Sequence, residues 1–184
     1  MKKVQASSLL ETLQTDTRHL LLKLARLQQL PANRLVQQPG PGRWSVAQVI
    51  EHLNTYGRYY LPKLQAAINN AGHTPTEWFV PGWLGGYFTN SMMPKPDGTI
   101  GNKMKTLKGH NPAPDIDAGK ALHEFEQQEI LLLQLLDKAG EVNINRIRIP
   151  ISIAPFIKLK MGDVFSFIIA HHQRHFVQIE NIIG

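Results

Sequence analysis

The chain has 184 residues, 42% of them hydrophobic and 18% charged, which is enough apolar material for a packed core and too little charge for a disordered chain. It has no cysteine, which excludes disulfides, thiolate metal sites, iron–sulfur clusters and a cysteine nucleophile. The net charge of +6 could suit an acidic ligand, but no arginine-rich helix, zinc finger or aromatic RNA-binding motif accompanies it. We therefore expect one domain over residues 1–184, with no nucleic-acid partner.

The amino terminus begins like a signal peptide but does not continue as one. Lys2 and Lys3 are basic, yet the residues that follow are mixed in polarity, and charges recur at Asp16 and Arg18. No stretch approaches the roughly 18 apolar residues of a membrane span. We expect a soluble, cytoplasmic protein with no membrane partner.

The first predicted element is a helix from about residue 7 to residue 29. Leucines recur in it at helical spacing, Ser7 or Ser8 could cap its start, and Pro31 follows its end. His19 lies on this helix, where a single histidine is more often satisfied or exposed than a metal ligand.

The second predicted helix follows the turn signal at residues 39–42 and runs to about Asn70. Ser45 is a suitable N-cap, and Gln48 stands three residues later, as in a capping box. His52 shares one face of this helix with apolar residues, so it points toward the core. A buried imidazole needs a partner, and either metal ligation or a hydrogen bond would supply one.

Residues 73–114 form a long insertion, and insertions of this length in compact domains are usually functional. The aromatic stretch 77–88 could form a short helix over the bundle, a pocket wall or a dimer contact. The insertion also carries a basic stretch, which is either a solvated loop or an attractor for an anionic ligand: Lys95, Lys103, Lys105 and Lys108. His73 and His110 are expected to be exposed.

A third helix is predicted from a cap at Asp115 or Asp117 to Ala139. After it, residues 142–150 alternate between apolar and polar, which predicts a short extended segment with one buried face. A fourth helix then begins between residues 160 and 163 and continues to about residue 183.

The fourth predicted helix carries the strongest chemical signal. His171 and His175 are spaced i, i+4, so both rings leave one face and can approach one cation. His172 is turned by about 100° and is expected to face solvent or another helix. Gln178, one turn beyond His175, could hold a ligand ring or a metal-bound water. The glutamate that a zincin peptidase needs after the first histidine is absent.

In their order and placement these motifs resemble the DinB/YfiT-like superfamily over essentially the whole chain. The motifs are Trp44-Ser45 at the start of the second helix, Glu51-His52-Leu53 two turns on, and the spacing of His171, His175 and Gln178. The resemblance implies an all-α, up-down-down-up four-helix bundle. The insertion at about 73–114 would lie between helices 2 and 3, and the extended segment before helix 4.

The resemblance also implies a divalent metal, held by three histidines that carry over by position to His52, His171 and His175. Zinc and nickel both suit imidazole, and three imidazoles leave an open position. Some members of the superfamily are thiol transferases or isomerases that use bacillithiol, mycothiol or glutathione. We therefore expect a metal-dependent thiol S-transferase or hydrolase with a small-molecule substrate. The alternative is a non-catalytic, metal-stabilised helical module that acts through a homodimer surface.

Overall fold

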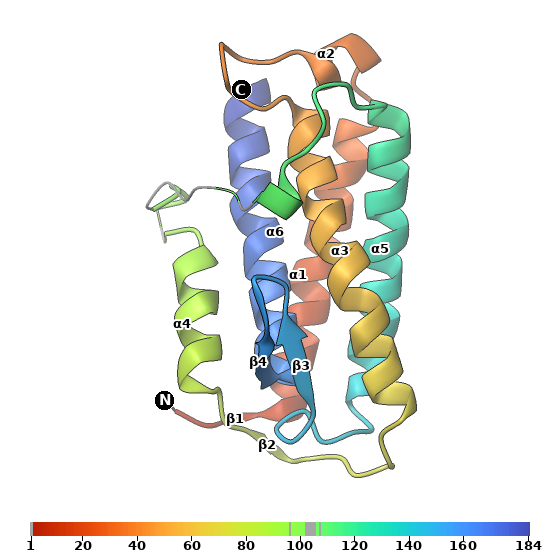
Figure 1. Ribbon diagram of the computed structural model, residues 1–184, viewed down its shortest axis with the longest axis vertical. Coiled ribbons are helices and arrows are strands. Elements are labelled where there is room, and N and C mark those ends of the chain that lie inside the picture. Colours follow the sequence, from red (N-terminus) through yellow and green to blue (C-terminus); the bar gives the residue numbers. More distant parts are fainter. Residues whose placement is uncertain (1, 96, 102–105, 107) are drawn as a thin grey trace.

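The protein is described by a computed structural model that covers residues 2–95, 97–101, 106 and 108–184 (Figure 1). It is largely helical, as predicted. The four long helices, α1 (Ala6–Leu27), α3 (Val46–Asn69), α5 (Ala118–Ala139) and α6 (Met161–Ile183), lie side by side. In Figure 1, α1 and α6 run toward one end of this bundle, and α3 and α5 toward the other. No helix in the described ranges is long and apolar enough to cross a membrane.

Side-chain caps set the start of two of these helices. At α3, Ser45 Oγ accepts a hydrogen bond from the Gln48 amide (3.3 Å), and Gln48 Oε1 accepts one from the Ser45 amide (3.0 Å). This is the predicted capping box, which satisfies two amides that the helix itself leaves unpaired. At α5, Asp117 accepts a hydrogen bond from the amide of Lys120 at 3.0 Å.

The predicted serine cap of α1 is wrong. The helix begins at Ala6, and its N-cap residue, Gln5, makes no side-chain capping bond. The start is held instead by the chain around residue 77. Ala6 donates its amide to the Glu77 carbonyl (2.9 Å), and β1 (Val4–Gln5) pairs antiparallel with β2 (Trp78–Phe79). Backbone from a segment distant in the sequence therefore stabilises the start of α1, where a serine cap was predicted.

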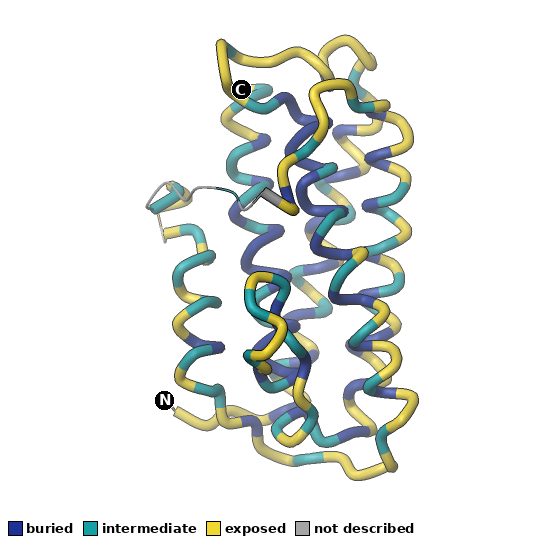
Figure 2. Tube along the Cα trace, viewed as in Figure 1, coloured by how far each residue is buried: buried dark blue, intermediate teal, exposed yellow. Residues whose placement is uncertain are grey.

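The apolar faces of the long helices meet in one core, and Figure 2 shows the buried residues along their inner sides. α3 and α5 approach closely because Gly57 carries no side chain. A Cβ there would lie 1.8 Å from Gln128 Oε1. An ion pair joins the same two helices, since Arg58 of α3 contacts Glu124 of α5 as well as Glu51 of its own helix.

Besides β2, the described part of the insertion contributes the helix α4 (Trp83–Met92) and the short 3-10 helix η1 (Lys108–His110). The aromatic stretch thus forms a short helix in part, as one of the alternatives predicted. Leu84 and Phe88 pack on the core, whereas Trp83 and Tyr87 are exposed. α4 lies alongside α6 (Figure 1).

A short helix and a two-stranded hairpin also lie between the long helices. α2 (Ala32–Val36), a short helix, precedes α3. β3 (Arg148–Ile151) and β4 (Ala154–Lys160) form an antiparallel hairpin before α6. The predicted extended segment is right only from residue 148. Before that the chain turns, because the Asn143 carbonyl accepts the amides of Arg146 and Ile147.

Candidate metal centre

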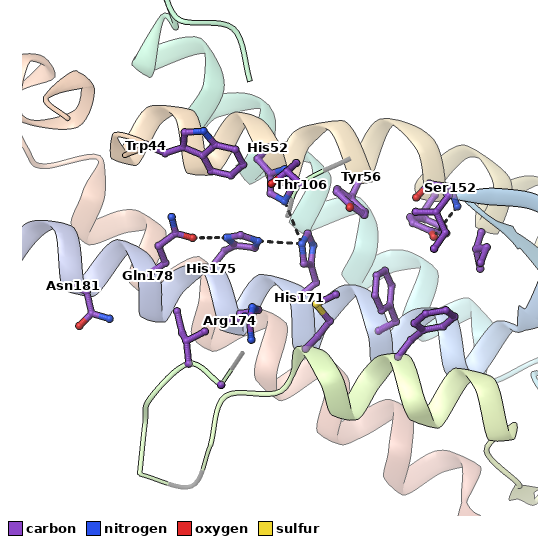
Figure 3. Close-up of a pocket in the computed structure, with 18 of the residues that line it drawn as sticks. Trp44, His52, Tyr56, Thr106, Ser152, His171, Arg174, His175, Gln178 and Asn181 are labelled. Atoms are coloured by element: carbon purple, nitrogen blue, oxygen red, sulfur yellow. Dashed lines mark hydrogen bonds between the residues drawn. The ribbon is translucent and has the colours of Figure 1, made fainter. Parts of the chain in front are cut away.

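Three histidines from two helices converge in the bundle. His52 comes from α3, and His171 and His175 come from α6 (Figure 3). The Nε2 atom of His171 lies 3.3 Å from that of His52 and 3.1 Å from that of His175. One nitrogen from each ring lies within 4.8 Å of the others, which makes the group able to hold a metal ion.

Hydrogen bonds on the far side of two rings fix which nitrogen faces the centre. His52 Nδ1 donates to the carbonyl of His110 at 2.7 Å, and His175 Nδ1 donates to Gln178 Oε1 at 2.8 Å. A carbonyl oxygen only accepts, so Nδ1 carries the proton in both rings. Each Nε2 therefore presents a lone pair to the other histidines.

Burial keeps these imidazoles neutral. It lowers the pKa of His52 to about 4 and that of His175 to about 3. Burial and the neighbouring His175 and His52 also hold the pKa of His171 well below its usual range. One proton on His171 Nε2 could be donated to only one neighbour, which leaves the lone pair of the other neighbour without a donor.

A cation would satisfy all three nitrogens at once. Two imidazole nitrogens bound 2.0–2.1 Å from a tetrahedral zinc ion are about 3.3 Å apart. The two short contacts around His171 Nε2, 3.1 and 3.3 Å, match that spacing. The donor set therefore fits a divalent ion that accepts imidazole ligands, such as zinc or nickel.

A cavity of about 1010 Å³ lies beside the three histidines, and all of them line it. Arg43 and Arg174 also line it, and no carboxylate does so among the described residues. Ile100, Gly101 and Thr106 bring the basic part of the insertion to the wall. Lys103, Lys105 and the Lys108 side chain lie outside the described residues, so their predicted role in attracting a ligand stays a prediction.

The model of the DinB superfamily matches residues 14–179 of this sequence. The chain belongs to the DinB superfamily. Among curated proteins there is no match.

One solved structure similar to this DinB-superfamily chain is that of YfiT from Bacillus subtilis, described as a probable metal-dependent hydrolase with an unusual four-helix bundle topology. The two share 12% sequence identity with a TM-score of 0.56, over 99% of this chain and 87% of that one. At that identity the likeness shows the fold alone.

His110 is the residue that sequence reasoning missed. It was expected to be exposed, which is wrong, because only 9% of it is accessible. Its ring stacks on Tyr56 at a centroid distance of 3.9 Å, and its Nδ1 lies 2.8 Å from Thr55 Oγ1. These contacts hold the His110 carbonyl against His52. No spacing in the sequence signals such a main-chain contact.

The other histidines of this DinB-superfamily chain lie outside the cluster. His172 is buried and faces another helix, as one of the two alternatives predicted, with Nδ1 2.9 Å from Glu129 Oε1 of α5. His19, His73 and His123 are exposed. The predicted neighbour Gln178 does contact a ring of the cluster, that of His175.

Proposed function

We propose that the protein is a metal-dependent hydrolase of small molecules, in which His52, His171 and His175 would hold a zinc or nickel ion beside the cavity that takes the substrate. The observation that carries this proposal is the convergence of three Nε2 atoms beside a cavity of about 1010 Å³. Structural zinc sites are closed by four protein ligands, whereas catalytic sites have three and an open position.

The chain's own residues have separable roles. The His110 carbonyl and Gln178 orient the rings of His52 and His175, as outer hydrogen bonds do at metal sites. When bound, the ion would act as a Lewis acid that lowers the pKa of a water or thiol at the open position.

Tyr56 lies where it can donate a hydrogen bond to a substrate in the cavity. Its ring centroid lies 4.4 Å from that of His171, and it lines the cavity. Burial raises its pKa to about 12, so the phenol stays protonated at neutral pH. Its hydroxyl makes no hydrogen bond within the part of the chain that the structure describes, and it can donate one to an oxygen that gains negative charge.

A low-molecular-weight thiol is the second candidate nucleophile. The cavity exceeds what water requires, and its two arginines suit the carboxylates that a thiol such as glutathione carries. The similarity to YfiT, described as a probable metal-dependent hydrolase, supports water as the first candidate.

We also propose how the chain is organised. We take residues 1–184 as one cytoplasmic domain in up-down-down-up order, with residues 73–114 as the insertion. A homodimer is part of the alternative hypothesis, in which the metal only stabilises the fold.

Metal analysis of purified protein tests the ligand set. The wild type should carry close to one equivalent of divalent ion, and His52→Ala and His171→Ala should each lose at least nine-tenths of it. His123→Ala is the matched control, because that side chain is 72% exposed and should leave the metal content unchanged. Wild-type metal content in both ligand variants would refute the site.

Activity separates the enzyme from the non-catalytic module. Metal-loaded and chelator-treated protein should be compared on nitrophenyl esters, and on glutathione with an aromatic electrophile. We expect faster ester hydrolysis with the loaded protein, and at least a tenfold lower kcat in Tyr56→Phe with its metal retained. If loading accelerates neither reaction, the non-catalytic module replaces the enzyme.

A further inference from the structure

The cavity is long, and the histidines divide it. Along α6 its lining begins at Val164 and ends at Ile182. At 1.5 Å per residue these positions are roughly 27 Å apart. His171 and His175 fall between them, and Figure 3 shows the three histidines with Ser152 beyond one side and Asn181 beyond the other. A bound molecule can therefore extend in two directions from the metal centre.

The arm toward the hairpin is apolar. We define this apolar arm by Tyr56, Tyr60, Phe88, Val164 and Phe167, with the β3–β4 turn at its end. The Phe167 ring lies 6.4 Å from Tyr56, 6.2 Å from Tyr60 and 6.4 Å from Phe88, measured between centroids.

The hairpin closes this arm, since the Ser152 amide donates to Tyr60 Oη at 3.0 Å. The arm follows α6 from His171 back to Val164, about 10 Å at 1.5 Å per residue. Aromatic and aliphatic walls of this kind favour apolar groups and disfavour charged ones.

The arm toward the end of α6 is polar. We define this polar arm by Arg43, Gln178 and Asn181, which line the cavity together with the apolar Trp44 and Ile182. It follows α6 from His175 to Asn181, about 9 Å at 1.5 Å per residue. The cavity as a whole is lined by two arginines and, within the described residues, by no aspartate or glutamate. Of the two, Arg43 lies in the polar arm, and its charge favours a negatively charged group at this end.

From this asymmetry, and resting on the proposed function, we infer that the substrate is an acyl conjugate with an anionic head. An ester or amide joins an apolar acyl group, bound in the apolar arm, to a polar group that carries a carboxylate or similar anion in the polar arm. The carbonyl between them then lies at the metal centre. Hydrolysis breaks the acyl C–O or C–N bond, forms a C–O bond to the water oxygen, and gives the proton to the leaving alcohol or amine.

Calorimetric titration of the full-length protein with N-acylglycines, from N-acetyl to N-decanoyl, tests this inference through binding. Affinity should rise roughly fourfold per added methylene until the chain fills the apolar arm, and then level off. Ser152→Phe should remove the gain of the longest members and leave N-acetylglycine unchanged. Ile153→Trp should act in the same way, and as Ile153 is 51% exposed, that variant folds even if the first does not.

The head group is tested separately. Arg43→Gln should weaken every member by roughly threefold, since an exposed charge contributes modestly at any chain length. The matched controls are Ser8→Phe and Arg18→Gln, two exposed positions on α1 outside the cavity, and both should bind as the wild type does.

The inference would be overturned if the affinity for N-acylglycines did not depend on acyl chain length. It would also be overturned if Ser152→Phe and Ile153→Trp both bound the longest members as the wild type does. Unchanged affinity in Arg43→Gln would overturn the anionic head. The same titrations on chelator-treated protein separate this inference from the metal proposal. If affinity depends on acyl chain length but the protein binds no metal, the inference stands and the metal proposal fails. If the protein binds metal but affinity does not depend on chain length, the metal proposal stands and the inference fails.

Discussion

His172 and Glu129 form a buried polar contact that the metal centre does not use. The two side chains are 4% and 1% exposed, and they join α6 to α5 across 2.9 Å. The Phe125 ring lies 5.2 Å from the imidazole, so the contact is enclosed by apolar groups. Neither side chain makes a hydrogen bond to the described residues, so this close contact is what offsets the cost of burying the two polar groups.

We expect His172→Leu to lower the free energy of unfolding by about 3 kcal/mol, because it leaves Glu129 buried alone. The double variant His172→Leu/Glu129→Leu should recover most of that loss, since two apolar side chains replace the pair. Denaturant unfolding measures both. Metal content should stay at the wild-type value throughout, and a loss like that of His171→Ala would place His172 in the metal centre instead.

The residues of the candidate site were predictable to different degrees. The inward position of His52 follows from the helical period of its neighbours, and the approach of His171 to His175 follows from their spacing. Joining the two helices needed the resemblance to a family, since periodicity does not say which faces meet. The role of His110 could not be predicted, because a backbone carbonyl has no signature in the side-chain sequence.

At the scale of elements, α4 is held against α6 by one carboxylate and one missing side chain. Asp163 of α6 accepts the amide of Gly82 through both oxygens, at 3.2 and 3.0 Å, where α4 begins. A Cβ at Gly85 would lie 2.3 Å from Asp163 Cγ. The close approach of the two helices, and with it the wall of the apolar arm, depends on that glycine.

Gly85→Val should therefore displace α4 and destabilise the protein by about 1–3 kcal/mol, as overpacking does. The matched control is Gly72→Ala, where an added Cβ meets nothing within 4 Å. Thermal unfolding gives the stability of both. Protease cleavage near α4 should accelerate only in Gly85→Val, and equal cleavage rates in both variants would contradict this account of docking.

The long helices were predictable because each has an apolar stripe over many turns and a boundary residue such as Ser45, Asp117 or Pro31. α2 was missed because its five residues are too short to show a period. β4 was missed because only one of its residues, Leu159, is buried, which leaves no alternation to detect, and because it contains Pro155. It pairs because β3 lies opposite, which is a tertiary effect rather than a local preference.

At the scale of the whole molecule, the neutral imidazoles make the stability of the metal-free fold depend on pH. In the unfolded chain they protonate near the ordinary pKa of about 6.5. In the folded chain burial holds the pKa at about 4 for His52 and about 3 for His175. Between about pH 6.5 and 4 the unfolded state therefore binds more protons than the folded state, so stability falls as the pH falls.

Chelator-treated protein should accordingly lose stability steadily from pH 6.5 to pH 4.5 in denaturant titrations. His52→Ala removes one of the titrating imidazoles. The free energy of unfolding of this variant should therefore fall by about 1.4 kcal/mol less per pH unit than that of the wild type. His73→Ala, at an exposed position, should keep the wild-type slope. A free energy of unfolding that is constant over this range would contradict the assignment of three neutral imidazoles.

The division of the three histidines between α3 and α6 has a consequence for how the protein is made. During synthesis α1, α3 and α5 leave the ribosome before α6 does. Until α6 follows, His52 is a lone imidazole with no partner nitrogen. The ion therefore cannot guide the early folding of the nascent chain. A metal ion at the proposed site would be held only once α3 and α6 have met, so metal loading would follow closure of the bundle.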